Sequence, residues 1–463
     1  MTWLAANQPL IATVGGVLVL VALIVRVRMN AFAALILVGI FSAIAAGMAP
    51  EHAIDTIVRG MGGTLGFIAV VIGLGALLGA ILEASGGVTA LAGQMLAGRG
   101  PVAGRWGMGV IGLVVAIPVF LDVAVIVLAP LVFALAARTS KPAMTFALPL
   151  LAGLAVGHAF VPPTPGPVAV AEILGTDPGW MIVFGLLVGA VAMPVAGPIY
   201  AGWLDRKGWM PPGAQHHLAG EEEPVPPVMN GPATAVLILL PLVLIFTGTL
   251  ATSLIPDDAL GSIRTARQVL YLIGHPFFAL LAACGLAMLF FRNASQAQRH
   301  RLQVGISRAL EPTGAVILVT GAGGAFKQVL VDTGAGAQLA GGALALGMTP
   351  LVAGYVLALL IRVAQGSATV AMITAAGLVS PIASAAGLSP PELALVAIAV
   401  ACGATALSHV NDSGFWLVSR IFGLTEREAF RTWTVTATLV SVTGFFCTCL
   451  LMLLLQASCG ALQ

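Results

Sequence analysis

The sequence predicts an all-α protein that crosses a membrane many times and is built from two inverted repeats. Each repeat is expected to contain about five transmembrane helices, one re-entrant hairpin and one broken helix. Composition gives the class: of 463 residues, 59% are hydrophobic and 8% are charged, with a mean hydropathy of +1.05. A soluble domain carries about 25% charged residues. The 56 glycines suit closely packed or interrupted membrane helices.

The first half, residues 1–204, contains apolar segments of about the 20 residues that a span needs. The predicted spans are 10–25, 31–48, 64–82 and 180–204, with a polar stretch at 51–59 before the third. The block 107–137 is too long for one span and contains Pro118 and Asp122, so we expect a hairpin that enters and leaves on the same side. The block 144–174 carries prolines at 162, 163, 165 and 167, which cannot continue a helix, and predicts a broken helix.

The second half, residues 232–463, repeats this plan after a hydrophilic segment, 205–231, that we interpret as a cytoplasmic linker. Its hairpin is the block 350–386, interrupted at Gln365-Gly366-Ser367. Its broken helix centres on residues 408–413. The remaining predicted spans are 233–255, 269–291, 313–331 and 434–455, with a basic loop at 292–308.

An internal repeat is also visible in an ungapped alignment of residues 66–86 with 314–334. The identities are Gly66/Gly314, Val71/Val319, Gly73/Gly321, Gly75/Gly323, Leu82/Leu330 and Gly86/Gly334. Placing Arg26 and Arg28 in the cytoplasm puts most of the 20 Lys and Arg residues inside. Five crossings per half then give the two halves opposite orientations. Inverted repeats with discontinuous helices are typical of secondary transporters, whose sites lie near the midplane.

Several classes of protein are disfavoured. The net charge is +2 without a basic run, so no nucleic-acid partner is expected. The five cysteines have neither metal-ligand spacing nor a disulfide framework, and no cofactor motif occurs. No basic residue precedes Arg26, so we do not expect a cleaved signal peptide. The expected partners are the lipid bilayer and a small anionic substrate.

Residues 408–416 form the densest polar run in the hydrophobic part of the chain. Polar backbone at membrane depth must line a cavity or be buried, which favours a broken helix over a surface loop. Arg362 lies too deep in the second hairpin to reach the interface. It either attracts an anionic substrate or forms a structural pair with Asp122 or Asp412, and the sequence leaves both open. Lys327, near a span end, is expected to extend to the interface.

Neutral polar groups at the breaks could bind substrate hydroxyls, although each could instead bond its own backbone. Together with Arg362, the candidate substrate-binding residues are Gln365, Gly366, Ser367, Thr369, Ser408, Asn411, Ser413 and Thr164. The candidate proton-coupling residues are Asp412, Asp122, His158 and His409. We favour Asp412 as the proton carrier, because it lies in the unwound stretch, and expect no cofactor besides the coupling proton.

The chain resembles the gluconate:proton symporter (gluconate permease) family. The resemblance is carried by residues 365–371, 408–416, 118–123, 158–167 and 323–327. It implies a bacterial inner-membrane symporter for sugar acids or similar hydroxy-carboxylates, related to the ion transporter superfamily, whose members tend to be dimers with a scaffold and a mobile domain. Thr164 stands where some gluconate carriers have histidine, and relatives carry glycerate, uronates or D-serine.

We therefore predict a proton-coupled secondary transporter for a small hydroxylated carboxylate rather than an enzyme. The alternatives are a carrier of D-serine or another hydroxy-amino acid, which would need an acidic partner for the second charge, and a small-anion channel. Saturation of the flux with substrate separates a transporter from a channel.

Overall fold

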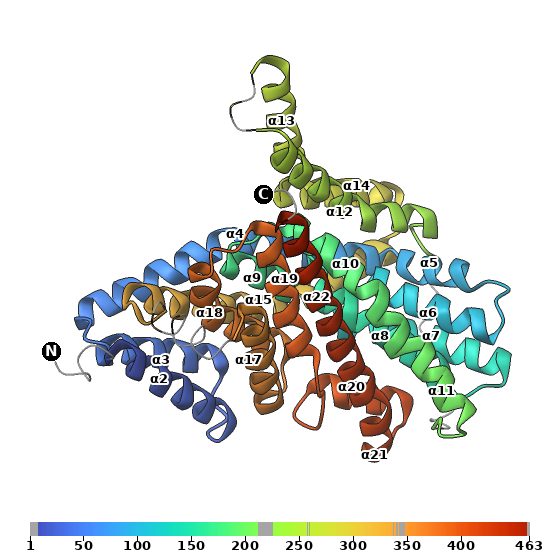
Figure 1. Ribbon diagram of the computed structural model, residues 1–463. Coiled ribbons are helices and arrows are strands. Elements are labelled where there is room, and N and C mark those ends of the chain that lie inside the picture. The colour runs from blue at the N-terminus through green and yellow to red at the C-terminus, as the bar shows by residue number, and fades with distance from the viewer. Residues whose placement is uncertain are drawn as a thin grey trace.

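The computed structural model describes residues 8–460 apart from 212–225, 257, 259, 337, 339–340 and 342–347. Throughout these residues the regular secondary structure is helical (Figure 1), which confirms the predicted class. Nine of the described helices are long and apolar enough to cross a membrane. Residues 212–225 of the predicted linker lie outside the described residues.

The first half begins with three helices and then forms a hairpin, a broken helix and a closing span. Its elements are α2 (Gln8–Val25), α3 (Ala31–Ala45), α4 (Pro50–Ala84), α5 (Gly87–Leu96), α6 (Pro101–Val115), α7 (Leu121–Thr139), α8 (Met144–Phe160), α9 (Pro165–Leu174), α10 (Pro178–Pro194), the π-helix η1 (Val195–Ile199) and α11 (Tyr200–Arg206).

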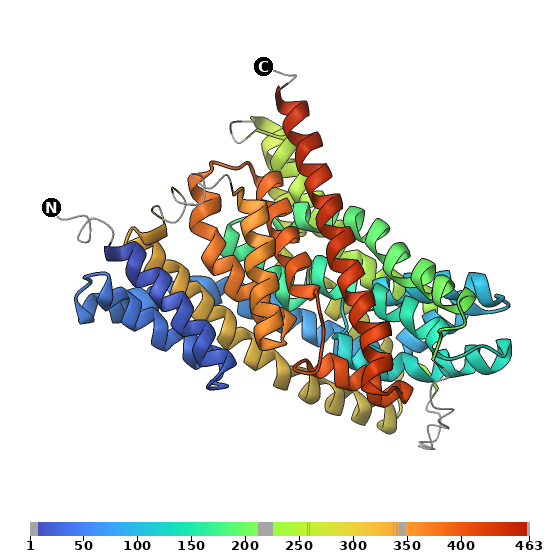
Figure 2. The ribbon, with the colours of Figure 1, turned by 60° about the horizontal axis from the view of Figure 1, so that its bottom comes forward.

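The second half also ends with a hairpin, a broken helix and a closing span. Its elements are α12 (Gly231–Leu254), α13 (Gly261–Gly274), α14 (Pro276–Leu289), the 3₁₀ turn η2 (Phe290–Asn293), α15 (Gln296–Asp332), α17 (Pro350–Gln365), α18 (Ala368–Ala385), α19 (Pro390–Thr405), α20 (Ser413–Phe422), α21 (Glu426–Ala429), the π-helix η3 (Phe430–Thr434) and α22 (Val435–Gly460). In Figure 2 the last of these, α22, runs along much of the molecule towards the C-terminus.

The predicted hairpins and broken helices are confirmed. The hairpin tips are residues 116–120 and 366–367, and the breaks are 161–164 and 406–412. In each half the first arm of the hairpin packs on the first part of the broken helix, α6 on α8 and α17 on α19. Glycines allow this approach: a Cβ on Gly153 would lie 2.1 Å from the Gly109 carbonyl, and one on Gly403 would lie 2.2 Å from the Tyr355 carbonyl.

The two longest helices, α4 and α15, pack side by side in opposite directions. Gly60 near the start of α4 meets Gly324 near the end of α15, whereas Ala80 near the end of α4 meets Gly305. An inverted relation of the halves would require this of helices with the same place in each repeat. The inverted repeat itself, and the boundaries at 204 and 232, remain predictions.

The polar stretch before the third predicted span is helical, and so is most of the segment that we predicted as a basic loop. Residues 51–59 belong to α4, which begins at Pro50, and Arg299, Arg301 and Arg308 belong to α15. The antiparallel packing explains both, because it gives charged residues at the helix ends partners on the other helix. Arg59 forms an ion pair with Asp332 at 3.0 Å.

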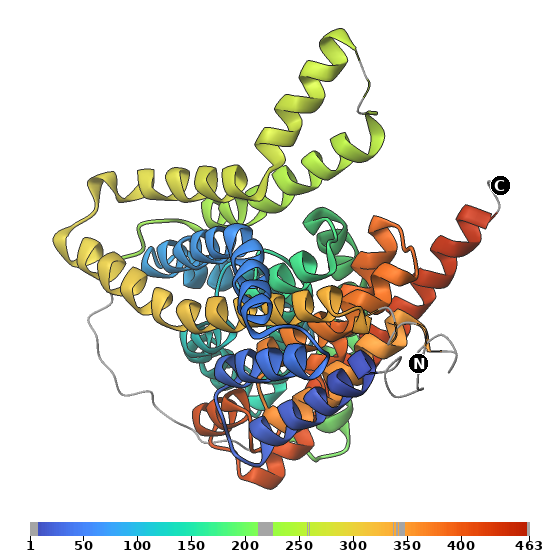
Figure 3. The same cartoon turned by 90° about the vertical axis from the view of Figure 1, so that its left-hand side faces the viewer.

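The predicted span 269–291 is wrong, because the chain breaks at His275-Pro276. Proline removes a backbone donor and clashes with the preceding turn, so α14 starts anew with Pro276 at its first position. Its N-cap is His275, whose Nδ1 accepts a hydrogen bond from Phe277 N at 3.3 Å. Helix α13 packs only on α12 and α14 among the helix pairs in close contact, and it projects from the other helices (Figures 1 and 3).

Candidate functional site

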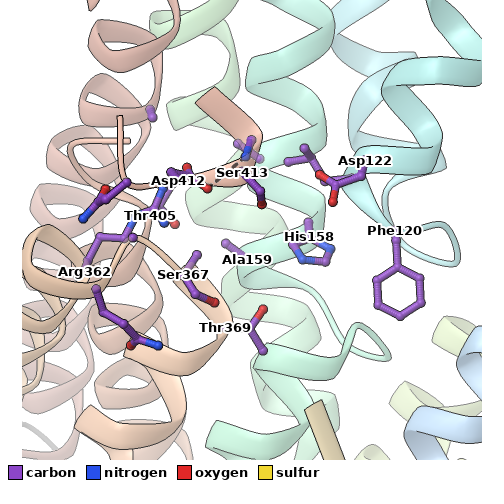
Figure 4. Close-up of a pocket in the computed structure, with 18 of the residues that line it drawn as sticks. Phe120, Asp122, His158, Ala159, Arg362, Ser367, Thr369, Thr405, Asp412 and Ser413 are labelled. Carbon is purple, nitrogen blue, oxygen red and sulfur yellow. Dashed lines mark hydrogen bonds and ion pairs between the residues drawn. The ribbon is translucent and has the colours of Figure 1, made fainter. Parts of the chain in front are cut away.

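A cavity of about 390 Å³ lies where the second hairpin tip, the second break and the first hairpin meet. The labelled side chains in Figure 4 converge on it from α7, α8, α17, α18 and the segment before α20. Helix α15 adds Pro312 and Val316, and the last span adds Trp433 and Ala437. Six separate parts of the chain thus enclose one polar space.

The second hairpin tip is shaped by Gly366. Its φ of +89° lies in the left-handed region, and a Cβ there would lie 2.2 Å from the Asn411 carbonyl oxygen. Ser367 then begins α18, and its Oγ accepts a hydrogen bond from Val370 N at 3.4 Å. The tip can therefore lie directly against the second break only because residue 366 has no side chain.

Arg362 supplies a buried positive charge to the site. It is 3% exposed, its Nη2 pairs with Asp412 Oδ2, and its Nε donates to the Ala406 carbonyl at 3.3 Å. Asp412 also accepts from Ser408 Oγ and caps α20 through Gly414 N at 3.0 Å. The structural pair with Asp412 is therefore present, and the pair with Asp122 is not. The other interpretation of Arg362, as the residue that attracts an anionic substrate, stays a prediction: Arg362 lines the cavity, and its Nη1 has no hydrogen-bond partner among the described residues.

Three buried polar atoms of residues around the cavity have no hydrogen-bond partner in the part of the chain that the structure describes. They are Arg362 Nη1, Gln365 Oε1 and His158 Nδ1, and all three residues line the cavity. Buried polar groups are nearly always hydrogen-bonded, so unsatisfied ones in a cavity indicate a ligand or water. The set offers a positively charged donor and an amide acceptor close to one another.

Asp122 lies across the cavity from Arg362 (Figure 4). It occupies the first turn of α7 and is exposed to the cavity, and no described side chain forms a hydrogen bond or ion pair with it. Helix N-termini favour negative charge, which accounts for a carboxylate at this place. The hydroxyls of Ser413 and Thr369 also line the cavity without a hydrogen-bond partner among the described residues.

Three predicted site residues lie outside this lining. Thr164 is 4% exposed and bonds the Val161 carbonyl at 2.7 Å, beside a separate cavity of only about 10 Å³. Ser408 is fully buried between Asp412 and Trp433, and His409 Nε2 lies 3.1 Å from the Val363 carbonyl. These side chains hold the breaks in place. Asn411 lines the cavity and also helps to hold the second break, since its Nδ2 donates to Val363 O at 2.9 Å.

Two further expectations need correction. His158 was predicted within the first break but lies in the last turn of α8. Lys327 was expected to extend to the interface, but it is half-buried and its Nζ donates to the carbonyl of Ile173, near the end of α9. A lysine at the C-terminal end of a neighbouring helix complements that helix's dipole, which explains why the ammonium stays inside.

Sequence reasoning missed Thr405 and Trp433. Trp433 lies in η3 and donates from Nε1 to Ser408 Oγ at 2.7 Å, while its side chain lines the cavity. Single π-helical turns are frequent at functional sites. No sequence signal links residue 433 to 408, because the contact depends on how the last span packs.

Comparison with known proteins decides the family. The sequence pattern of the GntP family permeases matches residues 8–454. This chain belongs to the GntP family of permeases. The low-affinity gluconate transporter of Escherichia coli K12 is 37% identical over 438 residues, which cover 94% of this chain and 96% of that protein. A gluconate permease of Pseudomonas aeruginosa is 35% identical, with 94% and 96% covered.

The fold of this GntP family permease also resembles solved structures. The Neisseria gonorrhoeae protein MtrF, described as illuminating a class of antimetabolite efflux pumps, superposes with a TM-score of 0.66. It is 14% identical, with 90% of this chain and 93% of that chain covered, so the likeness concerns the fold alone. The chain is thus a multi-pass transporter of the bacterial inner membrane and not an enzyme.

Proposed function

We propose that this permease takes up gluconate or a closely related sugar acid together with protons. The observation that carries the proposal is Arg362 Nη1, a buried guanidinium nitrogen that has no hydrogen-bond partner among the described residues and belongs to a side chain lining a polar cavity. A carboxylate is its geometric match, because guanidinium donors pair with carboxylate oxygens in a planar arrangement. Relatives with 35–37% identity are named gluconate transporters or permeases, which supports a sugar acid.

The rest of the cavity suits a chain of hydroxyl groups. Gln365 Oε1 can accept from a hydroxyl, and the Ser367, Thr369 and Ser413 hydroxyls can donate or accept. The volume of about 390 Å³ lies within the ~300–1,000 Å³ of small-molecule sites. The ligand would thus place its carboxylate at Arg362 and extend towards Asp122.

For the proton we propose Asp122 rather than Asp412. Asp412 already forms an ion pair with Arg362 and accepts hydrogen bonds from Ser408 Oγ and Gly414 N, so its oxygens are occupied by structural contacts. Asp122 has no such partner and faces the same cavity as the ligand. A proton bound by Asp122 would offset the negative charge that the substrate brings into the same cavity, which couples the two.

The test is uptake of labelled gluconate by purified protein in proteoliposomes, with and without a pH gradient that is acidic outside. We expect saturable uptake that accumulates gluconate under the gradient and collapses to equilibration with a protonophore. Gluconate accumulation that persists in the presence of the protonophore would overturn the proposed proton coupling. Absence of saturable uptake would overturn the transport of gluconate.

One observation favours a second candidate, a carrier of D-serine or another hydroxy-amino acid. The unpaired carboxylate of Asp122 opposite Arg362 could bind an ammonium group while Arg362 binds the carboxylate. Competition separates the two: a hundredfold excess of D-serine should leave gluconate uptake unchanged if the sugar acid is the substrate.

We also propose a homodimer, as the family resemblance implies. The protomer mass is 46.9 kDa. Light scattering with the detergent contribution subtracted should return about twice that protein mass, and a value equal to one protomer would refute the dimer.

A further inference from the structure

A second and larger cavity, of about 580 Å³, lies between α4, α7 and α15. Its polar lining consists of Glu83 from α4 and of His300, Arg301 and Arg308 from α15. The function proposed above does not use any of these residues. Their end of α15 is the one that the positive charges place at the cytoplasmic face.

One face of α15 runs from this second cavity to the central one. His300, Val304, Arg308, Pro312 and Val316 are spaced by four, so each lies next to the following one in a continuous row that winds slowly around α15. The first four line the second cavity, whereas Pro312 and Val316 line the central cavity. The two cavities are consequently neighbours along one helix rather than unrelated spaces.

The first hairpin tip separates the two cavities. Phe120, the residue before α7, lines both of them, as Pro312 does from the opposite side. Its ring lies 6.3 Å from the ring of His158, at the edge of the site in Figure 4. A small shift of this tip would join the two spaces.

The charge of the second cavity favours anions. Two guanidinium groups face a single carboxylate, Glu83, which interacts electrostatically with both Arg301 and Arg308. Neither arginine forms a hydrogen bond or an ion pair with another described residue. A concave surface with an excess of positive charge focuses the electrostatic field and concentrates anions.

We propose that this cavity is a second carboxylate-binding site, the inner vestibule through which the substrate passes between the central site and the cytoplasm. Arg308, one turn of α15 from Pro312, binds the carboxylate, Arg301 attracts it, and Phe120 is the barrier. That the bound carboxylate is a sugar acid rests on the proposed function; that the site takes an anion does not.

The anion site can be tested without any transport. In the full chain, Ala309→Cys places a thiol in the cavity, and Ser307→Cys places one on the exposed other side of α15. Each is labelled with an anionic and a cationic methanethiosulfonate, with the unsubstituted protein as background. We expect the ratio of anionic to cationic rate to be about tenfold higher at residue 309, the lower end of electrostatic focusing effects.

Arg301→Gln with Arg308→Gln should abolish that preference, while the control Arg427→Gln, an exposed arginine outside both cavities, should not change it. Equal ratios at 309 and 307, or a preference that survives loss of both arginines, would overturn the vestibule. Val304→Cys is a second reporter position in the same lining should Ala309→Cys fold poorly.

The ligand is tested in Arg362→Gln/Asp412→Asn protein, in which the central site no longer binds a carboxylate. Gluconate should still slow labelling at residue 309 there, and it should not slow labelling at 307. No protection at 309, with gluconate uptake by the wild type intact, would overturn the vestibule as a substrate site. No uptake by the wild type would overturn the proposed function instead, and the reagent ratio would still decide the anion site.

Discussion

The two halves of the central site are built in different ways. In the second half, the tip at 366–367 and the break at 406–412 are bound to each other: Asp412 pairs with Arg362, and both His409 and Asn411 contact the Val363 carbonyl. In the first half, Asp122 lies in the first turn of α7, just after the tip, and His158 lies in the last turn of α8, just before the break; neither side chain has a hydrogen-bond partner among the described residues.

The difference indicates a division of labour. A carboxylate ligand needs a cation held in a fixed place, and the second half supplies one with most of its hydrogen bonds satisfied. A group that gains and loses a proton needs freedom from permanent partners, and the first half supplies that. Substitutions in each half test this division, and their expected effects range from a loss of binding to a change of a few fold.

Removing one charge of the second-half pair should have the largest effect. Arg362→Gln leaves Asp412 buried without its counter-charge, and breaking such a pair destabilises by ~3–5 kcal/mol. We expect a lower Tm and loss of gluconate binding. Arg362→Gln/Asp412→Asn should recover the Tm without recovering binding. The control is Arg59→Gln, since an exposed pair such as Arg59–Asp332 contributes at most about 1 kcal/mol.

The two carboxylates should respond differently to neutralisation. Asp122→Asn should still bind gluconate and exchange it across the membrane, but a pH gradient should no longer drive accumulation. Asp412→Asn should instead lower the affinity, because Arg362 loses the partner that positions it. Both are measured by counterflow and by gradient-driven uptake. Normal gradient-driven accumulation by Asp122→Asn would move the proton to another group.

An added methyl group at or against each hairpin tip should separate the contributions of the two halves to binding and transport. Gly366→Ala forces a side chain onto a residue with φ +89° and against Asn411, so we expect a loss of ~1–3 kcal/mol in stability and weaker binding. Gly79→Ala would place a Cβ 2.0 Å from the Pro118 carbonyl and should displace the first tip, changing transport rate more than affinity. Gly66→Ala, with nothing within 4 Å, is the control and should be neutral or stabilising.

The smallest expected effect concerns two threonines. Thr369→Val removes a cavity-facing hydroxyl and should weaken gluconate binding by roughly 2–10-fold, equivalent to one hydrogen bond of ~0.5–1.5 kcal/mol. Thr164→Val removes a hydroxyl that bonds Val161 outside the central cavity, so the affinity should stay within twofold while the Tm falls. A larger affinity change for Thr164→Val would place substrate in the first break.

The sequence was sufficient to locate both tips, both breaks and Arg362, because glycine, proline and charge at membrane depth each have a direct structural cost that few arrangements relieve. The sequence was insufficient to predict which side chains of the two breaks face the cavity. Asn411 faces the cavity and Ser408 does not, but non-helical backbone has no period from which to read the facing side.

Residues brought by distant helices were equally hidden. Trp433 reaches the cavity through the packing of the last span, and Asp332 meets Arg59 only because α4 and α15 run antiparallel. The same packing explains why residues 51–59 and 299–308 are helical although their composition is typical of loops. The signal for each of these features lies in a partner far away in the chain.

The length of the α4–α15 pair ties the protein to its membrane. The 35-residue α4 is ~52 Å long at 1.5 Å per residue, well beyond a hydrocarbon thickness of ~30 Å. Its charged positions Arg59 and Glu83 lie ~36 Å apart along the axis. If they mark the two edges of the hydrocarbon, the pair is tilted by roughly 30°. The thickness of the bilayer then sets the inclination of α15, which lines both cavities. A change in lipid chain length would therefore change the geometry of the transport path.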